Sequence, residues 1–243
     1  MRSALAVWRL SRATLHVLWG MVLAASLPRR SAASRHALIQ RWSAAFVKHL
    51  GVALQVGGMP RPGATLVVAN HVSWLDVAAI HAAAPQLRFV AKADVLDWPL
   101  LGGLIRGGGT LFIERERKRD ALRVVHDIAA ALRGGDSVAV FPEGTTGAGP
   151  ELLPFHANLL QAAIATATPV QPVALRYADE ERDFSPSVEY VGATTLGQSL
   201  WRVACARGLR VHVGWLPAVN AAHADRRALA AHLRELIAER LQP

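Results

Sequence analysis

Beyond Gly51 the chain alternates between short, continuously apolar runs and longer amphipathic stretches. Short runs rich in β-branched residues and bounded by turn signals predict buried strands, whereas apolar residues three or four positions apart predict helices. The strands are expected at Thr65–Asn70, Leu87–Lys92, Thr110–Ile113, Ser137–Phe141, Val170–Arg176, Ser187–Val191 and Leu209–Val213. The helices are expected at Ser73–Ala84, Leu96–Ile105, Lys118–Arg133, Asn158–Ala167, Leu196–Ala206 and Asp225–Leu241, the last with Asp225 as its N-cap. This alternation predicts an α/β fold, in which residues 51–243 form a single domain with a mostly parallel or mixed sheet flanked by helices.

The first 50 residues have a different pattern. Residues 13–27 are mostly apolar and end at Pro28, a run shorter than the about 20 residues that a membrane-spanning helix needs. Residues 31–50 place apolar and aromatic side chains at helical spacing, with basic residues mostly elsewhere around the helix. Such basic, aromatic and amphipathic segments are typical of interfacial helices. We therefore expect residues 1–50 to form a membrane-associating helical hairpin that lies on the bilayer or dips into it.

Three other interpretations of this segment remain open. Residues 24–26 (Ala-Ala-Ser) come close to the small-residue cleavage site of a signal peptide. Adding residues 4–10 lengthens the apolar run towards that of a true spanning helix. The third interpretation is that both helices pack on the core as ordinary helices.

Composition and charge narrow the class of partner. The 243 residues are 52% hydrophobic and 19% charged, which excludes wholesale disorder. The net charge of +9 is uneven, because residues 1–75 contain nine basic residues and no acidic one, and the rest is balanced. These basic residues are spread among Leu, Val and Trp, which favours an anionic membrane surface over nucleic acid. Cys205 is the single cysteine, so a disulfide framework and a Cys-cluster metal site are excluded, and no metal ion or redox cofactor is expected.

The first candidate for chemistry follows the strand at 65–70. Ligands bind most often at the carboxyl ends of strands in α/β sheets, and this strand ends at Asn70-His71. Asp76 lies five residues after His71, close enough for a helix to bring its carboxylate back to the imidazole. An aspartate that accepts the Nδ1 proton leaves Nε2 free to act as a base. The alternative is that Asp76 forms a local cap or salt bridge and that His71 is an ordinary polar residue.

Three more clusters stand at predicted strands. The run Phe141–Thr145 (F-P-E-G-T) would project Glu143 from the mouth of the sheet. Arg115 follows a strand and could bind a phosphate with two hydrogen bonds. The alternative is that Arg115 is one member of a solvent-exposed charged run at 114–120. The two prolines in residues 168–175 predict an edge or bulged strand that bounds a pocket.

Together and in this order, these clusters resemble the motifs of the glycerolipid acyltransferases, the 1-acyl-sn-glycerol-3-phosphate acyltransferase family. The resemblance covers about residues 60–180. The matching positions are Asn70, His71 and Asp76 for N-H-x4-D; Lys92 in V-A-K; Gly109, Phe112, Ile113 and Arg115 for G-x2-F-I-x-R; Phe141–Thr145 for F-P-E-G-T; and Pro169–Ala174 for P-V-x-P-V-A.

The resemblance implies transfer of a fatty acyl group from a thioester, acyl-CoA or acyl carrier protein, to the free hydroxyl of 1-acyl-glycerol-3-phosphate, giving phosphatidic acid. His71 would be the general base, oriented by Asp76, without an acyl-enzyme intermediate. The residues expected to bind the acceptor are Arg115, Glu143, Gly144 and Thr145, with Asn70, Lys92, Gly109, Phe112 and Pro142 in support. Because the acceptor is a membrane lipid and the donor is cytosolic, the protein is expected at the cytoplasmic face of the inner membrane, held by a monotopic hairpin or a single N-terminal anchor.

The acceptor has an alternative. Where the family often has a basic F-K-x-G stretch, this chain has Phe155–Asn158 (F-H-A-N), and this segment with later runs also resembles lyso-ornithine lipid O-acyltransferases. That acceptor carries no phosphate. A hydrolase that uses the same histidine–aspartate pair on a lipid ester or thioester is a further alternative, and so is a non-catalytic membrane-binding protein with the same fold.

Overall fold

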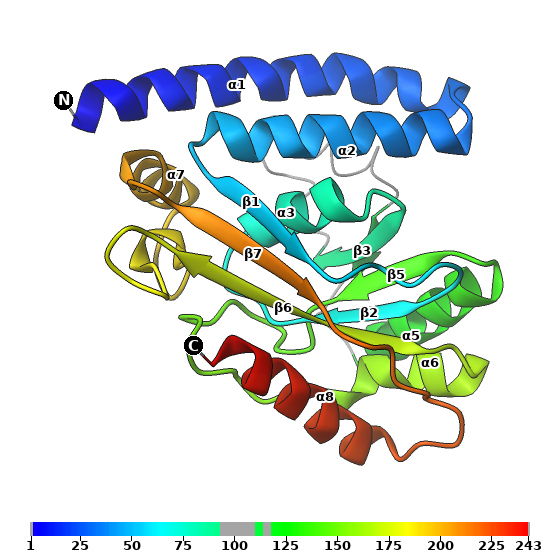
Figure 1. The fold of residues 1–243 in the computed structure, drawn as a ribbon. Coiled ribbons are helices and arrows are strands. Elements are labelled where there is room, and N and C mark those ends of the chain that lie inside the picture. Colours follow the sequence, from blue (N-terminus) through cyan, green and yellow to red (C-terminus); the bar gives the residue numbers. More distant parts are fainter. Residues whose placement is uncertain (1, 93–109, 114–117, 243) are drawn as a thin grey trace.

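A seven-stranded sheet lies between two layers of helices in the computed structural model, which describes residues 2–92, 110–113 and 118–242 (Figure 1). The helices are α1 (Arg2–Ser26), α2 (Ala32–His49), α3 (Leu75–Ala83), α5 (Lys118–Arg133), α6 (Gln161–Thr166), α7 (Leu196–Cys205) and α8 (Arg226–Leu241), with short 3-10 turns η1 (Leu27–Arg29), η3 (Ala157–Leu160) and η4 (Pro186–Val188). The strands are β1 (Ala53–Gly57), β2 (Leu66–Ala69), β3 (Leu87–Lys92), β4 (Leu111–Ile113), β5 (Ser137–Val140), β6 (Val170–Ala178) and β7 (Arg210–Trp215).

The sheet has the strand order β1-β7-β6-β2-β5-β3-β4. Strands β6, β2, β5, β3 and β4 run parallel to one another, whereas β7 is antiparallel to β6 and parallel to β1. The sheet is therefore mixed with a large parallel part, and the predicted fold class is confirmed. The order places β2 between β6 and β5, so the carboxyl ends of these three strands lie next to one another at one edge.

The central strands are buried on both faces. In β2, Val67 and Ala69 pack with α1, α2, α3 and α7, whereas Leu66 and Val68 pack with α5, α6 and α8. This explains why β2 is continuously apolar in sequence, as strands buried on both faces are. Figure 1 shows the same two layers, with α1, α2 and α3 above the sheet and α5, α6 and α8 below it.

Most predicted elements lie within a few residues of the observed ones, and Asp225 caps α8 as expected by accepting hydrogen bonds from the backbone N–H groups of Arg227 and Ala228. The expected helix Leu96–Ile105 lies outside the described residues. Strand β1 was not predicted. It is an edge strand whose residues are mostly exposed or half-buried, so it lacks the apolar run by which the buried strands are found.

The predicted strand at Ser187–Val191 is wrong. Residues 186–188 form the turn η4, and residues 189–191 are irregular. Pro186 has no N–H to give to a sheet and suits the first position of a helical turn, and Ser185 caps this turn by accepting a hydrogen bond from the N–H of Ser187 at 3.3 Å. Of this segment, Val188 alone is buried, and it packs into the core from the turn rather than from a strand.

The two prolines do not mark an edge strand, so that part of the prediction is wrong. Strand β6 is central, between β7 and β2. The Pro172 carbonyl accepts a hydrogen bond from the N–H of Leu216 at 3.0 Å, and Val170 pairs with Val219, so between these two contacts the chain after β7 has one more residue than β6. This irregular pairing is the bulge that the prediction allowed, and the Leu216 carbonyl accepts a hydrogen bond from the side-chain amide of Gln171 at 2.9 Å.

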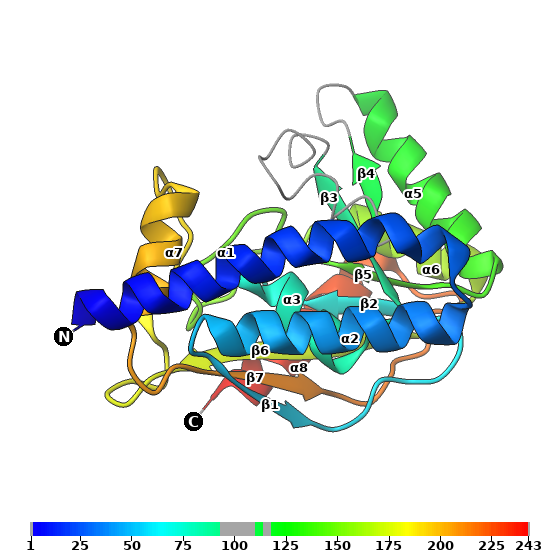
Figure 2. The ribbon, with the colours of Figure 1, turned by 90° about the horizontal axis from the view of Figure 1, so that it is seen from above.

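Residues 1–50 contain the predicted helical hairpin. Helices α1 and α2 run antiparallel across one side of the molecule, as Figure 2 shows from above. The ring Nε2 of His16 donates to the Trp42 carbonyl at 2.9 Å, and Trp42 Nε1 donates to the His16 carbonyl at 3.1 Å. The hairpin is also joined to the rest of the chain, because Arg9 donates to the carbonyls of Ala204 and Ala206. Its buried side chains share one apolar core with the sheet.

The other side of α1 is exposed and apolar. Its exposed large side chains are Leu5, Val7, Trp8, Leu15, Leu18, Trp19, Met21 and Val22. By length and composition, Ser3–Arg29 is the one helix in the described part of the chain that could cross a membrane, with a mean hydropathy of 1.3, although a signal sequence would meet the same criteria. Only 22% of its most apolar window is buried, which distinguishes it from a core helix. The exposed apolar face is compatible with membrane association.

Candidate active site

The turn that follows β2 brings His71 and Asp76 together. Nδ1 of His71 lies 2.8 Å from Oδ2 of Asp76, within hydrogen-bonding distance. Helix α3 begins at Leu75, so Asp76 is in its first turn and its side chain reaches back over the preceding loop. Asp76 is completely buried, whereas the side chain of His71 is 20% exposed. Because Nδ1 is bonded to the carboxylate, Nε2 is the ring nitrogen left for chemistry.

Asp76 is held by several donors besides His71. Its Oδ2 also accepts hydrogen bonds from the backbone N–H groups of Val72 at 2.8 Å and Ser73 at 3.0 Å. Its Oδ1 accepts from the hydroxyl of Tyr177 at 2.7 Å. Burial, followed by the charge of Asp76 and this hydrogen bond, raises the pKa of Tyr177 well above its usual value. The hydroxyl therefore remains a donor, and the buried carboxylate is satisfied at both oxygens.

The ring of His71 is fixed from the side as well. Phe141 stacks on it with ring centroids 4.0 Å apart and an interplanar angle of 14°, and Phe89 stacks in turn on Phe141 at 5.9 Å. Phe141 directly follows β5, and Phe89 lies in β3. The neighbouring strands thus restrict the plane of the imidazole, while the hydrogen bond to Asp76 sets its rotation within that plane.

Glu143 reaches the same loop through its carboxylate. Its Oε1 accepts the backbone N–H of His71 at 2.7 Å, and its Oε2 accepts the N–H of Leu153 at 2.9 Å. The residue is 4% exposed. Burial raises the pKa of Glu143, and the two backbone hydrogen bonds oppose that rise. In this structure Glu143 connects two loops, and its expected contact with an acceptor stays a prediction.

The rest of the F-P-E-G-T run forms a tight turn next to His71. Gly144 has φ +72°, a left-handed conformation that favours glycine, and its N–H donates to the Phe141 carbonyl at 3.1 Å. Pro142 is buried and its carbonyl accepts the N–H of His156, whereas Thr145 is exposed. Gly147, just beyond the turn, donates to the His71 carbonyl at 2.7 Å. The turn and the His71 loop are therefore bonded directly to each other.

Asn70 extends the sheet with its side chain. Its Nδ2 donates to the Leu175 carbonyl at 2.9 Å and its Oδ1 accepts the Leu175 N–H at 2.7 Å. The amide thus continues the pairing of β2 with β6 for one more step, after the last backbone pair, Ala69 with Val173. This bidentate contact holds the end of β2 in place immediately before His71, which gives Asn70 a supporting role in the fold of the loop.

The remaining predicted site residues lie further along the same sheet or outside the described residues. Lys92 ends β3 and pairs with Ile113, and Phe112 is half-buried in β4, where it pairs with Ala91. Gly109 and Arg115 lie outside the described residues. Within the described part, no group of three or more His, Cys, Asp or Glu side chains is arranged to hold a metal ion.

Sequence reasoning missed Tyr177 and Leu153. Tyr177 lies in β6, three residues beyond the end of the P-V-x-P-V-A run and two residues after Leu175, which Asn70 contacts. The predicted strand ended at Arg176, so the available signal was weak: a tyrosine directly after a strand expected to be buried needs a partner for its hydroxyl. Leu153 acts through its backbone N–H, which its side-chain type does not reveal.

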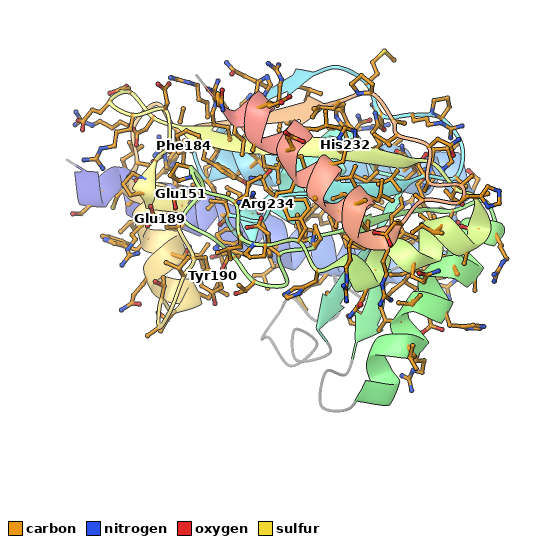
Figure 3. The ribbon with its side chains drawn as sticks, turned by 90° about the horizontal axis from the view of Figure 1, so that it is seen from below. Glu151, Phe184, Glu189, Tyr190, His232 and Arg234 are labelled. Carbon is orange, nitrogen blue, oxygen red and sulfur yellow. The ribbon has the colours of Figure 1, made fainter. Side chains whose placement is uncertain are left out.

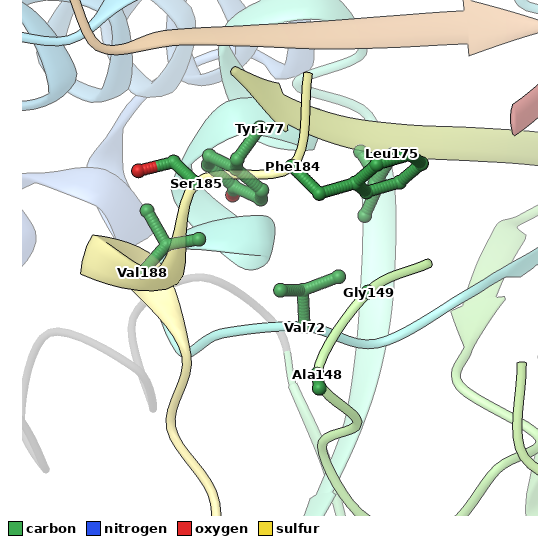
Figure 4. Close-up of a pocket in the computed structure, with 8 residues that line it drawn as sticks. All are labelled: Val72, Ala148, Gly149, Leu175, Tyr177, Phe184, Ser185 and Val188. Carbon is green, nitrogen blue, oxygen red and sulfur yellow. The ribbon is translucent and has the colours of Figure 1, made fainter. Parts of the chain in front are cut away.

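A small hollow lies beside Tyr177 and Val72, two residues that donate hydrogen bonds to Asp76. The space between its lining atoms is about 180 Å³ including open solvent, and it encloses no room for a water molecule. Figure 4 shows it between β6, the loop after β2, and the segments around residues 148 and 185. It is lined by Val72, Ala148, Gly149, Leu175, Tyr177, Phe184, Ser185 and Val188. Tyr177 is both a wall of this hollow and the partner of Asp76.

Comparison with known proteins supports one family. The family model described as Acyltransferase matches residues 55–176. A protein of Neisseria meningitidis named 1-acyl-sn-glycerol-3-phosphate acyltransferase is 39% identical over 193 residues, which cover 77% of this chain and 74% of that protein. A protein of Pseudomonas aeruginosa named lyso-ornithine lipid O-acyltransferase is 35% identical over 205 residues, which cover 84% of this chain and 78% of that protein.

The fold is shared with a solved structure. The crystal structure of the 1-acyl-sn-glycerophosphate (LPA) acyltransferase PlsC from Thermotoga maritima matches with a TM-score of 0.74 and 21% identity, over 99% of this chain and 96% of that one. The family model and the relatives define an enzyme of the acyl-transferring class. The chain belongs to the acyltransferase family, and it is an O-acyltransferase.

Proposed function

We propose that this enzyme transfers a fatty acyl group from an acyl thioester to the free hydroxyl of 1-acyl-glycerol-3-phosphate and so forms phosphatidic acid. The observation that carries the proposal is the His71–Asp76 pair, in which a buried carboxylate orients a partly exposed imidazole. The choice of acceptor rests on similarity to relatives named for this activity and on the complete F-P-E-G-T run beside His71.

The chemistry requires one base and no covalent enzyme intermediate. Nε2 of His71 takes the proton of the acceptor hydroxyl as its oxygen attacks the thioester carbonyl. The tetrahedral intermediate then breaks its C–S bond, the new ester C–O bond remains, and the protonated His71 gives its proton to the leaving thiolate. Asp76 stabilises the imidazolium during this sequence. Ser73, the nearest hydroxyl in the chain sequence, is completely buried, and Cys205 lies at the end of α7.

The donor is acyl-CoA or acyl carrier protein, and the acceptor lies in a bilayer, so we place the enzyme at the cytoplasmic face of the inner membrane. The exposed apolar face of α1 supports this placement, together with arginines at positions 12, 29 and 30 that would meet anionic headgroups. Docking by this face would keep the molecule at the surface where the lipid hydroxyl is presented.

A second acceptor has support from one observation. Proteins named lyso-ornithine lipid O-acyltransferase are 34–35% identical to this chain over 84–86% of its length. The F-H-A-N segment, Phe155–Asn158, contacts the candidate site, because the His156 N–H donates to the Pro142 carbonyl at 2.8 Å. A lyso-ornithine lipid would use the same base chemistry without a phosphate contact.

One experiment separates these candidates. The purified enzyme in lipid or detergent is given a labelled acyl thioester with lysophosphatidic acid or lyso-ornithine lipid in parallel, and His71→Ala is run beside the wild type. Product from lysophosphatidic acid alone supports the proposal, whereas product from lyso-ornithine lipid alone replaces its acceptor. Release of free fatty acid with neither acceptor consumed would identify a hydrolase. Transfer by His71→Ala at the wild-type rate would refute the base assignment.

A further inference from the structure

Among the described residues, Arg234 of helix α8 donates two hydrogen bonds to the loop beside the active site. Its Nε donates to the Leu153 carbonyl at 3.1 Å and a terminal nitrogen donates to the Leu152 carbonyl at 2.6 Å. Arg234 is half-buried and lies on the side of the molecule shown in Figure 3. A planar guanidinium can hold two neighbouring carbonyls at once, which fixes their orientation as well as their position.

The residue held in this way is the one that Glu143 contacts. While the Leu153 carbonyl accepts from Arg234, the Leu153 N–H donates to Oε2 of Glu143 at 2.9 Å. The other oxygen of Glu143 accepts the N–H of His71 at 2.7 Å. A continuous series of hydrogen bonds therefore runs from α8 through the loop and a buried carboxylate to the backbone of the histidine.

The loop needs such support because it has no regular structure of its own. Residues 141–156 contain neither helix nor strand. Backbone groups in irregular segments depend on side chains or water for their hydrogen bonds, and their position is only as well fixed as those bonds. Leu152 is buried, which anchors the loop at one point, and Arg234 fixes the direction in which the next N–H is aimed.

We propose that Arg234 is a positioning residue for acyl transfer, and that it acts through Leu153 and Glu143 on the backbone of His71. The proposal rests on the role of His71 as the general base. It assigns to Glu143 the task of holding the His71 loop, and to α8 the task of holding Glu143. The guanidinium itself touches no reacting atom, so its loss is expected to change the rate of the chemical step more than the binding of either substrate.

The first test compares two substitutions of Arg234, one that removes its hydrogen-bond donors and one that keeps a donor. Arg234→Met keeps the apolar stem and removes both hydrogen bonds. We expect kcat to fall by about 10- to 100-fold, the effect of a displacement of about 1 Å at a reacting group, with KM for both substrates changed by less than about threefold. Arg234→Lys retains a cation that can donate to both carbonyls, so it should recover most of kcat. Arg226→Met is the matched control, since Arg226 is an exposed arginine in the first turn of the same helix.

A double-mutant cycle tests the route. Glu143→Gln leaves one oxygen and places an amide group opposite one of the two N–H donors, so it breaks the same series of bonds. If Arg234 acts through Glu143, adding Arg234→Met to Glu143→Gln should lower kcat by less than about threefold beyond the single Glu143→Gln variant. All rates are normalised to the folded fraction from circular dichroism, and Arg234→Gln replaces Arg234→Met in the cycle if the latter does not fold.

Two outcomes would overturn the inference while leaving the proposed function intact. One is a wild-type kcat in Arg234→Met, and the other is multiplicative losses in the double variant, which would mean that the two residues act independently. A wild-type enzyme that transfers no acyl group to either lysolipid, or a His71→Ala variant that retains full activity, would instead refute the proposed function.

Discussion

Tyr177 donates a hydrogen bond to Oδ1 of Asp76, the carboxylate oxygen that His71 does not contact. The two donors come from different strands, because His71 follows β2 and Tyr177 lies in the adjacent strand β6. The sheet therefore fixes the angle of the carboxylate at two points. The Tyr177 contact therefore adds to the backbone N–H groups of Val72 and Ser73 in holding the carboxylate that orients the imidazole.

Tyr177→Phe is expected to lower kcat by about tenfold and to lower the free energy of unfolding by about 1–3 kcal/mol, since it leaves Oδ1 of a completely buried carboxylate without a partner. Acyl transfer to lysophosphatidic acid and urea unfolding measure the two effects. The chain has one other tyrosine, Tyr190, so Tyr190→Phe is the matched control. Wild-type values of both quantities in Tyr177→Phe would show that the hydroxyl does not position Asp76.

Asp76→Asn should be the more damaging change. Asp76 accepts four hydrogen bonds in this structure, and an amide, with one oxygen and one NH2 group, cannot accept all of them. If the NH2 group faces His71, it donates to Nδ1 and the proton of the imidazole moves to Nε2, where the base is needed. We expect kcat to fall by about 10³- to 10⁴-fold, as for such substitutions in other histidine–aspartate enzymes. A smaller loss than in Tyr177→Phe would contradict this view of the pair.

The sequence could predict the His71–Asp76 pair because the two residues are five positions apart and lie across one strand–helix turn. Tyr177 is 101 residues from Asp76 and reaches it only because the sheet order puts β6 beside β2. That order cannot be read from periodicity. The role of Glu143 was missed for another reason, since its motif shows that a carboxylate is present but not that two backbone N–H groups occupy it.

The helices and strands likewise include some that the sequence could predict and some that it could not. Continuously apolar strands such as β2 and β5 were predictable because burial on both faces leaves a run of apolar residues. Edge strand β1 is mostly exposed or half-buried and has no such run, and the segment at 187–191 has strand-like composition but follows a proline that starts a turn. A short stretch of sequence therefore shows whether a strand is buried, but it does not show which strands pair with each other.

Acid stability should depend on His81. Burial lowers the pKa of His81 to about 4 from 6.5, and its Nδ1 has no hydrogen-bond partner among the described residues. Between these pH values the unfolded chain binds a proton at this histidine and the folded chain does not. Stability is therefore lost as the pH falls from 6.5 to about 4, by up to about 3 kcal/mol, and no further loss from this group occurs below that range.

Urea unfolding of the wild type and of His81→Leu from pH 7 to pH 4 tests this effect. The difference in the free energy of unfolding between the two proteins should change in favour of the variant as the pH falls, because leucine cannot take up a proton in the unfolded chain. His232→Leu, at an exposed position of α8, is the matched control for replacing an imidazole. A difference that stays constant across this pH range would mean that His81 is not held neutral by the fold.

The exposed face of α1 provides the last prediction. Leu15 is 67% exposed and Trp19 is 57% exposed, one turn apart on that face. Insertion of each side chain into a bilayer is worth about 1.5–3 kcal/mol, so Leu15→Glu and Trp19→Glu should each lower the partition onto anionic vesicles by at least about tenfold. The fold should be unaffected, since neither side chain is part of the core.

Vesicle cosedimentation measures this partition, and the comparison of two acceptors separates docking from chemistry. The variants should lose transfer to lysophosphatidic acid in vesicles and keep transfer to a short-chain acceptor dissolved as monomers. Leu122→Glu is the matched control, because Leu122 is 74% exposed on α5, in the opposite layer of the molecule. Two results would show that this face of the hairpin does not bind the membrane. One is that Leu122→Glu weakens vesicle binding as much as the α1 variants do, and the other is that the α1 variants bind vesicles like the wild type.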